Sequence, residues 1–207
     1  MALSGSDAQR LRECLDGGGV VVFPTDTIYG LGCDPENETA VRRLYELKGR
    51  PADRPAAIMF FDADLATATL TELGDRERAA IAALLPGPVT LLLANRDRRF
   101  PLASGPQADS RMLGLRIPLL GDALGALVSV GRPVMQSSAN LSGGSEARAL
   151  SDVPGSVLAG ADLLIDGGEL PGVASTVLDL HDYQRTGKWS IVREGAMARE
   201  AIERALS

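Results

Sequence analysis

The architecture follows from one stretch near the N-terminus, Val20-Val21-Val22-Phe23-Pro24-Thr25-Asp26-Thr27-Ile28-Tyr29-Gly30-Leu31-Gly32. Its first four residues form a continuous apolar run, which is typical of a β-strand buried on both faces. If the stretch stays extended, the hydroxyls at positions 25, 27 and 29 share one side, because side chains alternate along a strand. The two glycines allow other backbone or a ligand to come close. We predict a buried strand leading into a polar binding loop, with an ordinary turn of locally bonded threonines as the alternative.

Helical and strand patterns alternate along the rest of the chain. A capping signal at residues 6–9 opens a helix with Ala8, Leu11 and Leu15 on one face. The strands after residue 163 follow one another with turns between them, so we predict one α/β (α+β) domain over residues 1–207 with a mixed sheet. The predicted helices cover residues 6–16, 38–48, 75–85, 122–130 and 196–206, and the predicted strands cover residues 20–23, 57–61, 89–94, 113–118, 133–136, 163–166, 175–180 and 189–193.

Composition indicates a globular domain with an aliphatic core. Hydrophobic residues make up 45% of the 207 residues and charged residues 23%, whereas aromatic residues make up only 4%. No apolar run approaches the roughly 18 residues that are needed to span a bilayer. Residues 1–10 lack the basic and apolar regions of a signal peptide. We therefore expect a cytoplasmic protein that does not interact with a membrane.

The scarcity of cysteine and histidine restricts the chemistry. Cys14 and Cys33 lack a metal-type spacing, which favours buried free thiols over a disulfide or a zinc site. The single histidine, His181, falls in a polar stretch that is typical of an exposed hairpin turn. A Ser-His-Asp or Cys-His catalytic arrangement needs a better-placed histidine, and a His-based metal site is nearly excluded. We assign no metal site to the protein's own side chains.

Charge is unevenly distributed along the chain. The net charge of −6 and the pI near 4.9 argue against general nucleic-acid affinity. Residues 42–54 nevertheless carry an excess of positive charge. The basic residues there are Arg42, Arg43, Lys48, Arg50 and Arg54, and the acidic residues are Glu46 and Asp53. A local basic site in an acidic protein suits a bound anionic ligand better than a DNA or RNA duplex.

Two of these cations lie where a helix is predicted to end. Asn37 is placed to cap the helix, positions 40, 41, 44 and 47 have helical apolar spacing, and Gly49 with Pro51 stops it. Lys48 then occupies the last turn and Arg50 follows it, and we expect both side chains to lie outside the buried face. The pair is suited to hold a polyanion, although cations at helix ends also simply complement the helix dipole.

A second polar loop and two strand arginines complete the candidate site. In residues 137–144 (SSANLSGG), Ser138 and Asn140 offer a hydroxyl and an amide to a phosphate or carboxylate and a ribose, unless they form an ordinary Asx turn. Arg116 lies on an otherwise apolar strand, where it needs either an internal ion pair or a ligand carboxylate. Arg193 repeats this arrangement on the last strand. Standard nucleotide motifs are absent, so spacing points to a phosphorylated ligand without naming the reaction.

Six short motifs follow one another along the chain. They are PTDTIYGLG at residues 24–32, KGRP at 48–51, LPGPVT at 85–90, LRIP at 115–118, SANLSG at 138–143 and ASTV at 174–177. In this order they resemble the motifs of YrdC-like proteins over about residues 8–195, and the chain is similar to the short single-domain L-threonylcarbamoyladenylate synthases. The resemblance implies a twisted, mostly open sheet with flanking helices around a concave basic groove.

The resemblance also implies a reaction. L-threonine, bicarbonate and ATP, with Mg²⁺ accompanying the ATP, give threonylcarbamoyl-AMP and pyrophosphate. Downstream proteins then transfer the threonylcarbamoyl group to the tRNA adenosine beside the anticodon. Such chemistry agrees with the residues, because fixed cations stabilise charge on phosphoryl oxygens and no histidine base is required.

Site residues follow from matching the motifs. The implied ATP contacts are Lys48, Arg50, Ser138, Asn140 and Arg193, the implied threonine contacts are Thr27, Arg116 and Ser175, and the additional candidates are Thr25, Tyr29 and Arg54. Three features depart from the family pattern and bear on nucleotide contacts. Arg54 stands where many relatives have Asn or Lys, and Met59 stands near where many relatives have a His or other polar residue. Residues 143–148 replace a different loop.

Two other functions compete with the synthase. One is a non-catalytic translation or ribosome-assembly factor that binds double-stranded RNA or tRNA. The other is a carbamoyl-adenylate-forming protein of the hydrogenase-maturation type, which uses carbamoyl phosphate. The intact pairs Lys48/Arg50 and Ser138/Asn140 favour catalysis over RNA binding, and the missing acylphosphatase and zinc-finger segments disfavour the hydrogenase type.

Overall fold

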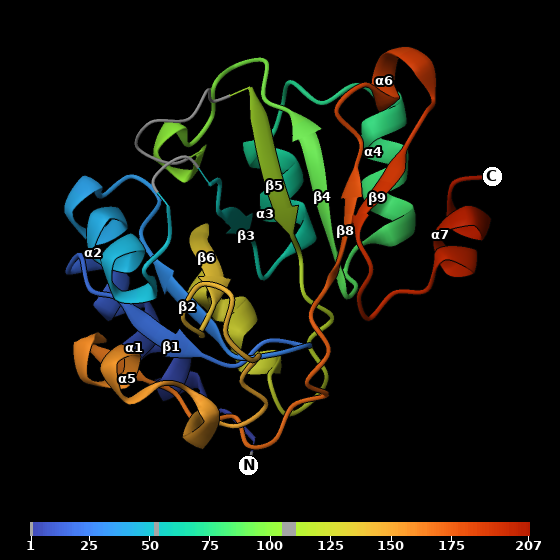
Figure 1. Cartoon of the computed structure of the whole chain (residues 1–207). Coiled ribbons are helices and arrows are strands. Elements are labelled where there is room, and N and C mark those ends of the chain that lie inside the picture. The colour runs from blue at the N-terminus through green and yellow to red at the C-terminus, as the bar shows by residue number, and fades with distance from the viewer. Residues whose placement is uncertain (1, 52–53, 105–110) are drawn as a thin grey trace.

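The computed structural model describes residues 2–51, 54–104 and 111–207, and in these residues nine strands form one mixed sheet (Figure 1). Its strand order is β7-β1-β2-β6-β3-β5-β4-β8-β9. The pairs β1/β7, β3/β5 and β4/β8 are parallel and the other neighbours are antiparallel, which confirms the predicted mixed sheet. The strands are β1 Val21–Phe23, β2 Gly30–Cys33, β3 Ala57–Met59, β4 Val89–Ala94, β5 Met112–Arg116, β6 Val134–Ser138, β7 Leu163–Leu164, β8 Thr176–Asp179 and β9 Ser190–Arg193.

Most of the helices are short. They are α1 Gly5–Asp16, α2 Glu38–Lys48, α3 Ala63–Thr69, α4 Asp75–Leu84, α5 Gly155–Gly160, α6 Tyr183–Thr186 and α7 Arg199–Ala205, with 3₁₀ turns η1 Pro101–Ser104, η2 Gly125–Val130 and η3 Leu150–Asp152. In the described part of the chain, none of them has the length and apolar character that crossing a bilayer requires. The predicted helix over 122–130 is only the 3₁₀ segment η2, and α3 and α5 were not predicted.

Two expectations about single residue types need correction. The stretch from His181 does connect the antiparallel strands β8 and β9, but it contains the short helix α6 in place of a simple turn, because its backbone N–H groups find local acceptors at Asp179 and Asp182. His181 itself is half-buried and not exposed. Both cysteines are free, as predicted, but Cys33 is buried whereas Cys14 is only half-buried.

Helix capping fixes the ends of α1 and α2. Ser4 caps α1 through a capping box with Asp7, two residues before the predicted cap, and the predicted buried face is confirmed. Asn37 caps α2 by accepting the N–H of Ala40 at 3.0 Å. Gly49, in the left-handed region at φ 59°, ends this helix. The helix predicted over 38–48 is therefore confirmed at both ends.

Alternation along the central strands separates a covered face from an open one. On β5, Leu113 and Leu115 join the core that includes residues of α3 and α4. In Figure 1, α3 lies behind β4 and β5, and α4 lies behind β8 and β9. The alternate residues Met112, Gly114 and Arg116 point to the opposite face and line a pocket there. Because the side-chain period of a strand is two, hydrophobic patterning that builds the core also assigns the other face to a ligand.

The packing of α2 against the sheet gives a stability test. Leu44 is fully buried in α2, so Leu44→Ala is expected to lower the free energy of unfolding by about 2–5 kcal/mol through lost burial and a cavity. Urea unfolding measures this loss. Val128→Ala, at an apolar side chain that is 44% exposed, is the control and should cost under about 0.5 kcal/mol. Equal losses in both variants would contradict the assigned packing.

Candidate active site

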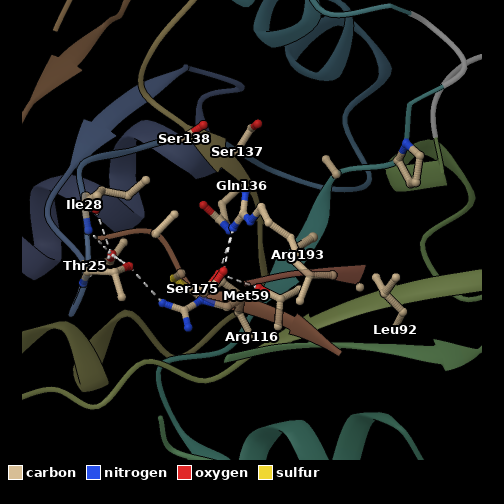
Figure 2. Close-up of a pocket in the computed structure, with 18 of the residues that line it drawn as sticks. Thr25, Ile28, Met59, Leu92, Arg116, Gln136, Ser137, Ser138, Ser175 and Arg193 are labelled. Atoms are coloured by element: carbon tan, nitrogen blue, oxygen red, sulfur yellow. Dashed lines mark hydrogen bonds between the residues drawn. The ribbon is translucent and has the colours of Figure 1, made fainter. Parts of the chain in front are cut away.

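A pocket of about 330 Å³ opens on the side of β3, β4 and β5 opposite to the core that includes α3 and α4 (Figure 2). Its walls come from the loop after β1, the loop after α2, and strands β3, β4, β5, β6, β8 and β9. Most of the predicted site residues line it. They are Thr25, Thr27, Arg50, Arg54, Arg116, Ser138, Ser175 and Arg193. Predicted site residues that are up to 168 positions apart in the sequence therefore line the same pocket.

Arg116 is the central cation of this pocket and is only 2% exposed. Its Nη1 donates to the carbonyl oxygens of Gly87 at 3.0 Å and Val89 at 3.1 Å. Its Nη2 pairs with the carboxylate of Asp26 and donates to Thr27 Oγ1 at 3.3 Å. Burial lowers the pKa of Arg116, and the charge of Asp26 opposes that shift. The internal ion pair, one of the two predicted alternatives, is therefore present.

Asp26 was not identified as a functional residue from the sequence. Its side chain is 6% exposed, and its second carboxylate oxygen accepts the backbone N–H of Leu119 at 3.0 Å. One carboxylate thereby joins the loop after β1 to β5 and to the segment that follows β5. The sequence signal was available, because a buried strand arginine needs an acidic partner and Asp26 is the acid within the PTDT motif.

Lys48 lies behind the pocket wall and not in its lining, as judged from the described residues. It is 3% exposed, so the expected placement outside the buried face of α2 is wrong. Its Nζ donates to Ser138 O at 2.6 Å and Oγ at 3.0 Å, and to Asn140 O at 2.9 Å and Oδ1 at 2.7 Å. These oxygens replace water around the ammonium, which explains how the helix end accepts burial.

Burial also sets the titration of this ammonium. Desolvation, followed by the nearby positive charge of Arg50, lowers the pKa of Lys48 to about 8, and the carboxylate of Glu146 opposes the shift. Ser138 Oγ donates to Asn140 Oδ1 at 2.7 Å, which closes a network of three side chains. Lys48 and Asn140 therefore hold in place the loop whose Ser138 faces the pocket.

Arg50 and Arg54 form the wall next to this network. Arg50 is half-buried, donates to Arg54 O at 3.2 Å and Ser137 Oγ at 3.4 Å, and lies 5.9 Å from the ring centre of Tyr45. Desolvation lowers the pKa of Arg50, whereas Tyr45 raises it. Asp53, counted in the basic segment, lies outside the described residues. Both arginine side chains line the pocket.

Hydroxyl groups line the floor of the pocket. Ser175 Oγ lies 2.8 Å from Thr90 Oγ1, and Arg193 donates to Ser175 O at 2.7 Å. Thr25 Oγ1 lies 3.1 Å from Thr27 Oγ1 and donates to a backbone carbonyl at 2.7 Å, so the local threonine bonding weighed as an alternative is present too. Thr90 belongs to the LPGPVT motif, but sequence reasoning did not include it in the site.

Tyr29 points away from this group of hydroxyls. Its hydroxyl lies 3.0 Å from Asp166 Oδ1 and 2.9 Å from Gly168 O, and it accepts the N–H of Gly167 at 3.0 Å. Burial raises its pKa to about 12. The expectation that residues 25, 27 and 29 share one side is wrong, because residues 24–29 form a bent loop and not a strand. Tyr29 therefore anchors the segment after β7 and does not line the pocket.

The segment 143–148, where the chain departs from the family pattern, folds back beside the site. Asn140 Nδ2 donates to Gly144 O at 2.5 Å, and Glu146 accepts the N–H of Ala174 at 2.9 Å. Met59, the other departure, lines the pocket directly beside Arg116 in the register of β3 and β5. A thioether therefore occupies a position next to the central cation.

The electrostatic character of the pocket is positive. Among the described residues that line it there are four arginines and no Asp or Glu. The described part of the chain also lacks any group of three His, Cys, Asp or Glu side chains placed to hold a metal ion. Guanidinium and hydroxyl groups do not fit Mg²⁺ as a resident ion, whereas they suit phosphate and carboxylate ligands.

Fold and pocket together define an α/β protein with a basic ligand site on the open face of a mixed sheet. The chain belongs to the Sua5/YciO/YrdC family, whose model, described as telomere recombination, matches residues 13–195. The confirmed resemblance extends to individual relatives. Threonylcarbamoyl-AMP synthase of Pyrococcus abyssi is 32% identical over 190 residues, and that of Xanthomonas campestris pv. campestris strain B100 is 33% identical over 159 residues.

Lengths differ between these proteins. The matches cover 91% of this chain but 54% of the Pyrococcus abyssi protein, and 76% of this chain and 83% of the Xanthomonas protein. The solved structure of Pyrococcus abyssi Sua5 complexed with L-threonine has a TM-score of 0.83 and 29% identity, covering 99% of this chain and 58% of that one. Escherichia coli YciO has a TM-score of 0.79 and 25% identity, covering 96% and 94%.

The buried ammonium of Lys48 gives a test with a defined direction in pH. Its folded pKa of about 8 lies below the ordinary value of 10.5, so between these values the unfolded chain keeps a proton that the folded chain has released. The free energy of unfolding contributed by this group therefore rises with pH in that window. Relative to Lys48→Met, the wild type is expected to gain at least about 1 kcal/mol from pH 7.5 to 9.5.

Urea unfolding of both proteins at the two pH values measures the gain. Lys188→Met is the matched control, because Lys188 is the other lysine of the chain and is exposed. The difference between wild type and Lys188→Met should stay constant with pH. A constant difference for Lys48→Met as well would mean that the ammonium is not desolvated.

Proposed function

We propose that this chain is a threonylcarbamoyl-AMP synthase, which converts L-threonine, bicarbonate and ATP into threonylcarbamoyl-AMP, pyrophosphate and water. The observation that carries the proposal is a pocket with four arginines and no acidic lining residue in the described chain, in a protein whose relatives bear this name. A neighbour of the same fold binds L-threonine. These supports concern the shared domain, since the chain spans about half the length of the Pyrococcus relative.

The pocket suits the charge changes of such a reaction. The threonine amine and bicarbonate form a carbamate, whose oxygen attacks the α-phosphorus while pyrophosphate leaves. Negative charge develops on phosphoryl oxygens, and preorganised guanidinium groups stabilise it without reorganisation. In our proposal Arg50, Ser138 and Arg193 contact the nucleotide, and Arg54 adds positive charge beside them. Lys48 and Asn140 act on the nucleotide through the Ser138 loop that they hold.

Threonine has its own group of residues in this proposal. Arg116 supplies a fixed positive charge to the threonine carboxylate, while Thr27 and Ser175 offer hydroxyls to the rest of the amino acid. Both terminal nitrogens of Arg116 already donate to protein acceptors. The carboxylate is therefore bound beside the Arg116–Asp26 pair, and a free bidentate fork would require these contacts to be exchanged.

The proposal also includes a metal ion, downstream proteins and a cellular compartment. Mg²⁺ would accompany the ATP phosphates, since the protein offers no carboxylate for it in the described pocket, and no step here depends on it. The product is a mixed anhydride, so proteins that transfer the threonylcarbamoyl group to tRNA must consume it. ATP and tRNA both point to the cytoplasm as its compartment.

Product formation tests the proposal directly. Purified protein with ATP, Mg²⁺, bicarbonate and threonine is expected to release pyrophosphate and to form threonylcarbamoyl-AMP, detected by mass spectrometry. Arg50→Ala is expected to cut the rate at least about tenfold, because losing one cation aimed at developing charge commonly costs a few kcal/mol. Arg42→Ala, an exposed cation outside the pocket on α2, should keep the full rate. Pyrophosphate release that does not require threonine would refute the assignment.

Substitution of Arg116 separates the two substrates. Arg116→Lys keeps a charge but loses the planar guanidinium, so it is expected to weaken threonine binding at least about tenfold and ATP binding much less. Calorimetric titration of each ligand into the variant provides the comparison. Unchanged threonine affinity, or an equal loss for both ligands, would make Arg116 a purely structural partner of Asp26.

A further inference from the structure

The ASTV motif at residues 174–177 places two hydroxyl side chains next to each other, and only one of them lines the pocket. Ser175 belongs to the lining, whereas Thr176, the first residue of β8, lies outside the lining that the described residues form and is fully buried. Because side chains alternate along a strand, Thr176 points away from the substrates. A buried hydroxyl needs hydrogen-bond partners in the protein, and these partners indicate what Thr176 holds in place.

The hydroxyl of Thr176 binds the segment that follows β9. Its Oγ1 donates to Met197 O at 2.7 Å and accepts the backbone N–H of Met197 at 3.0 Å. The N–H of Ala196 donates to Ala174 O at 2.8 Å. We call Gly195, Ala196 and Met197 the strap, because they run past the start of β8 before the chain reaches α7 (Figure 1). The donor and an acceptor site of one hydroxyl are therefore both used to hold the strap.

The strap lies directly against the peptide group between Ser175 and Thr176. A Cβ added at Gly195 would lie 2.4 Å from Ala174 O and 2.5 Å from both Ser175 C and Thr176 N. Real Cβ atoms essentially never come within 3.0 Å of another heavy atom, so only glycine permits this approach. The backbone that carries Ser175 is therefore in contact with the strap, and the hydrogen bonds of Thr176 keep the two together.

Two arginines of the pocket are supported by the same group of contacts. Arg193, two residues before the strap, donates to Ser175 O at 2.7 Å (Figure 2). Met197 lies beside Gly87, where an added Cβ would be 3.2 Å from the Cε of Met197. The carbonyl oxygen of Gly87 accepts from Arg116 at 3.0 Å. The strap therefore packs against the backbone that supports Ser175, Arg116 and Arg193, although it does not line the pocket in the described chain.

We propose that Thr176 is a positioning residue for the threonine substrate: its hydroxyl keeps the strap against the Ser175 peptide and thereby fixes the direction of Ser175 Oγ. This role rests on the proposed function, in which Ser175 contacts threonine. Valine has nearly the shape of threonine, but it can form neither of the hydrogen bonds to Met197. Thr176→Val therefore releases the strap without leaving an empty space around residue 176.

Calorimetric titration of L-threonine and of ATP into three variants tests this role. Thr176→Val is expected to weaken threonine binding at least about fivefold, from the lost hydrogen bonds, and ATP binding much less, because most of the proposed nucleotide contacts lie on other segments. Thr176→Ser keeps the hydroxyl and should bind both ligands within about twofold of wild type. Thr186→Val is the matched control and should change neither affinity. The Thr186 hydroxyl also donates to a carbonyl, Asp182 O at 2.9 Å, and accepts an N–H, that of Lys188 at 3.1 Å, but it lies outside the pocket lining.

The variants separate positioning from stability. A merely structural hydroxyl would lower the free energy of unfolding of Thr176→Val, measured with urea, and leave the threonine affinity of the folded protein unchanged, which overturns the role. An equal loss of threonine affinity in Thr176→Ser and Thr176→Val, or a loss in Thr186→Val, also overturns it.

A milder variant covers the case in which Thr176→Val does not fold. Met197→Ala removes a half-buried side chain of the strap and is expected to weaken threonine binding about twofold to fivefold, through the lost packing on Gly87. Unchanged threonine affinity in this variant overturns the role and leaves the proposed function standing. Wild-type protein that binds no threonine overturns both.

Discussion

The buried ion pair between Arg116 and Asp26 is the interaction on which the site depends. A guanidinium inside the sheet is costly unless every donor is satisfied. The protein meets that requirement with a carboxylate from the loop after β1 and with two carbonyl oxygens at the start of β4. Segments 90 residues apart are thereby fixed relative to one another. The same contacts hold the guanidinium at the edge of the pocket. The interactions that stabilise the buried charge therefore also position it for a ligand.

A second buried cation, Lys48, fixes another part of the site from behind the pocket wall. Lys48 ends α2 and is surrounded by oxygens of the Ser138–Asn140 turn, which follows β6. Protein contacts fix the positions of both cations before a ligand binds. Preorganised charge of this kind is what stabilisation of a developing phosphoryl charge requires, because little reorganisation remains to be done. Along each central strand, side chains alternate between the core face and the pocket face.

Local sequence signals predicted much of the fold. The apolar run at 20–23 and the capped, glycine-ended pattern at 38–48 were confirmed because their determinants lie within a few residues. The helices α3 and α5 were missed, since six or seven residues give too little periodicity to distinguish them from loops. The capping box of α1 was placed two residues late because several small polar residues compete there.

Most of the residues that line the candidate site were predicted from the sequence, but their contacts with one another were not. Arg116 was recognised as anomalous on an apolar strand, whereas its partner Asp26 was missed because the pairing joins distant segments. Lys48 was expected to be exposed, because its acceptors come from a loop about 90 residues further along the chain. Tyr29 was grouped with the threonines on the assumption of an extended backbone. In each case the error concerns where the chain bends, which depends on tertiary contacts.

The account claims that one buried ion pair serves both the fold and threonine binding. A double-mutant cycle with Asp26→Asn and Arg116→Lys tests this most directly when unfolding free energy and threonine affinity are measured on the same four proteins. We expect a coupling above about 1 kcal/mol in both quantities, because Asp26→Asn leaves the buried guanidinium without its carboxylate and Arg116→Lys loses the planar group that pairs with that carboxylate. Coupling in stability alone, with additive effects on threonine affinity, would contradict the claim.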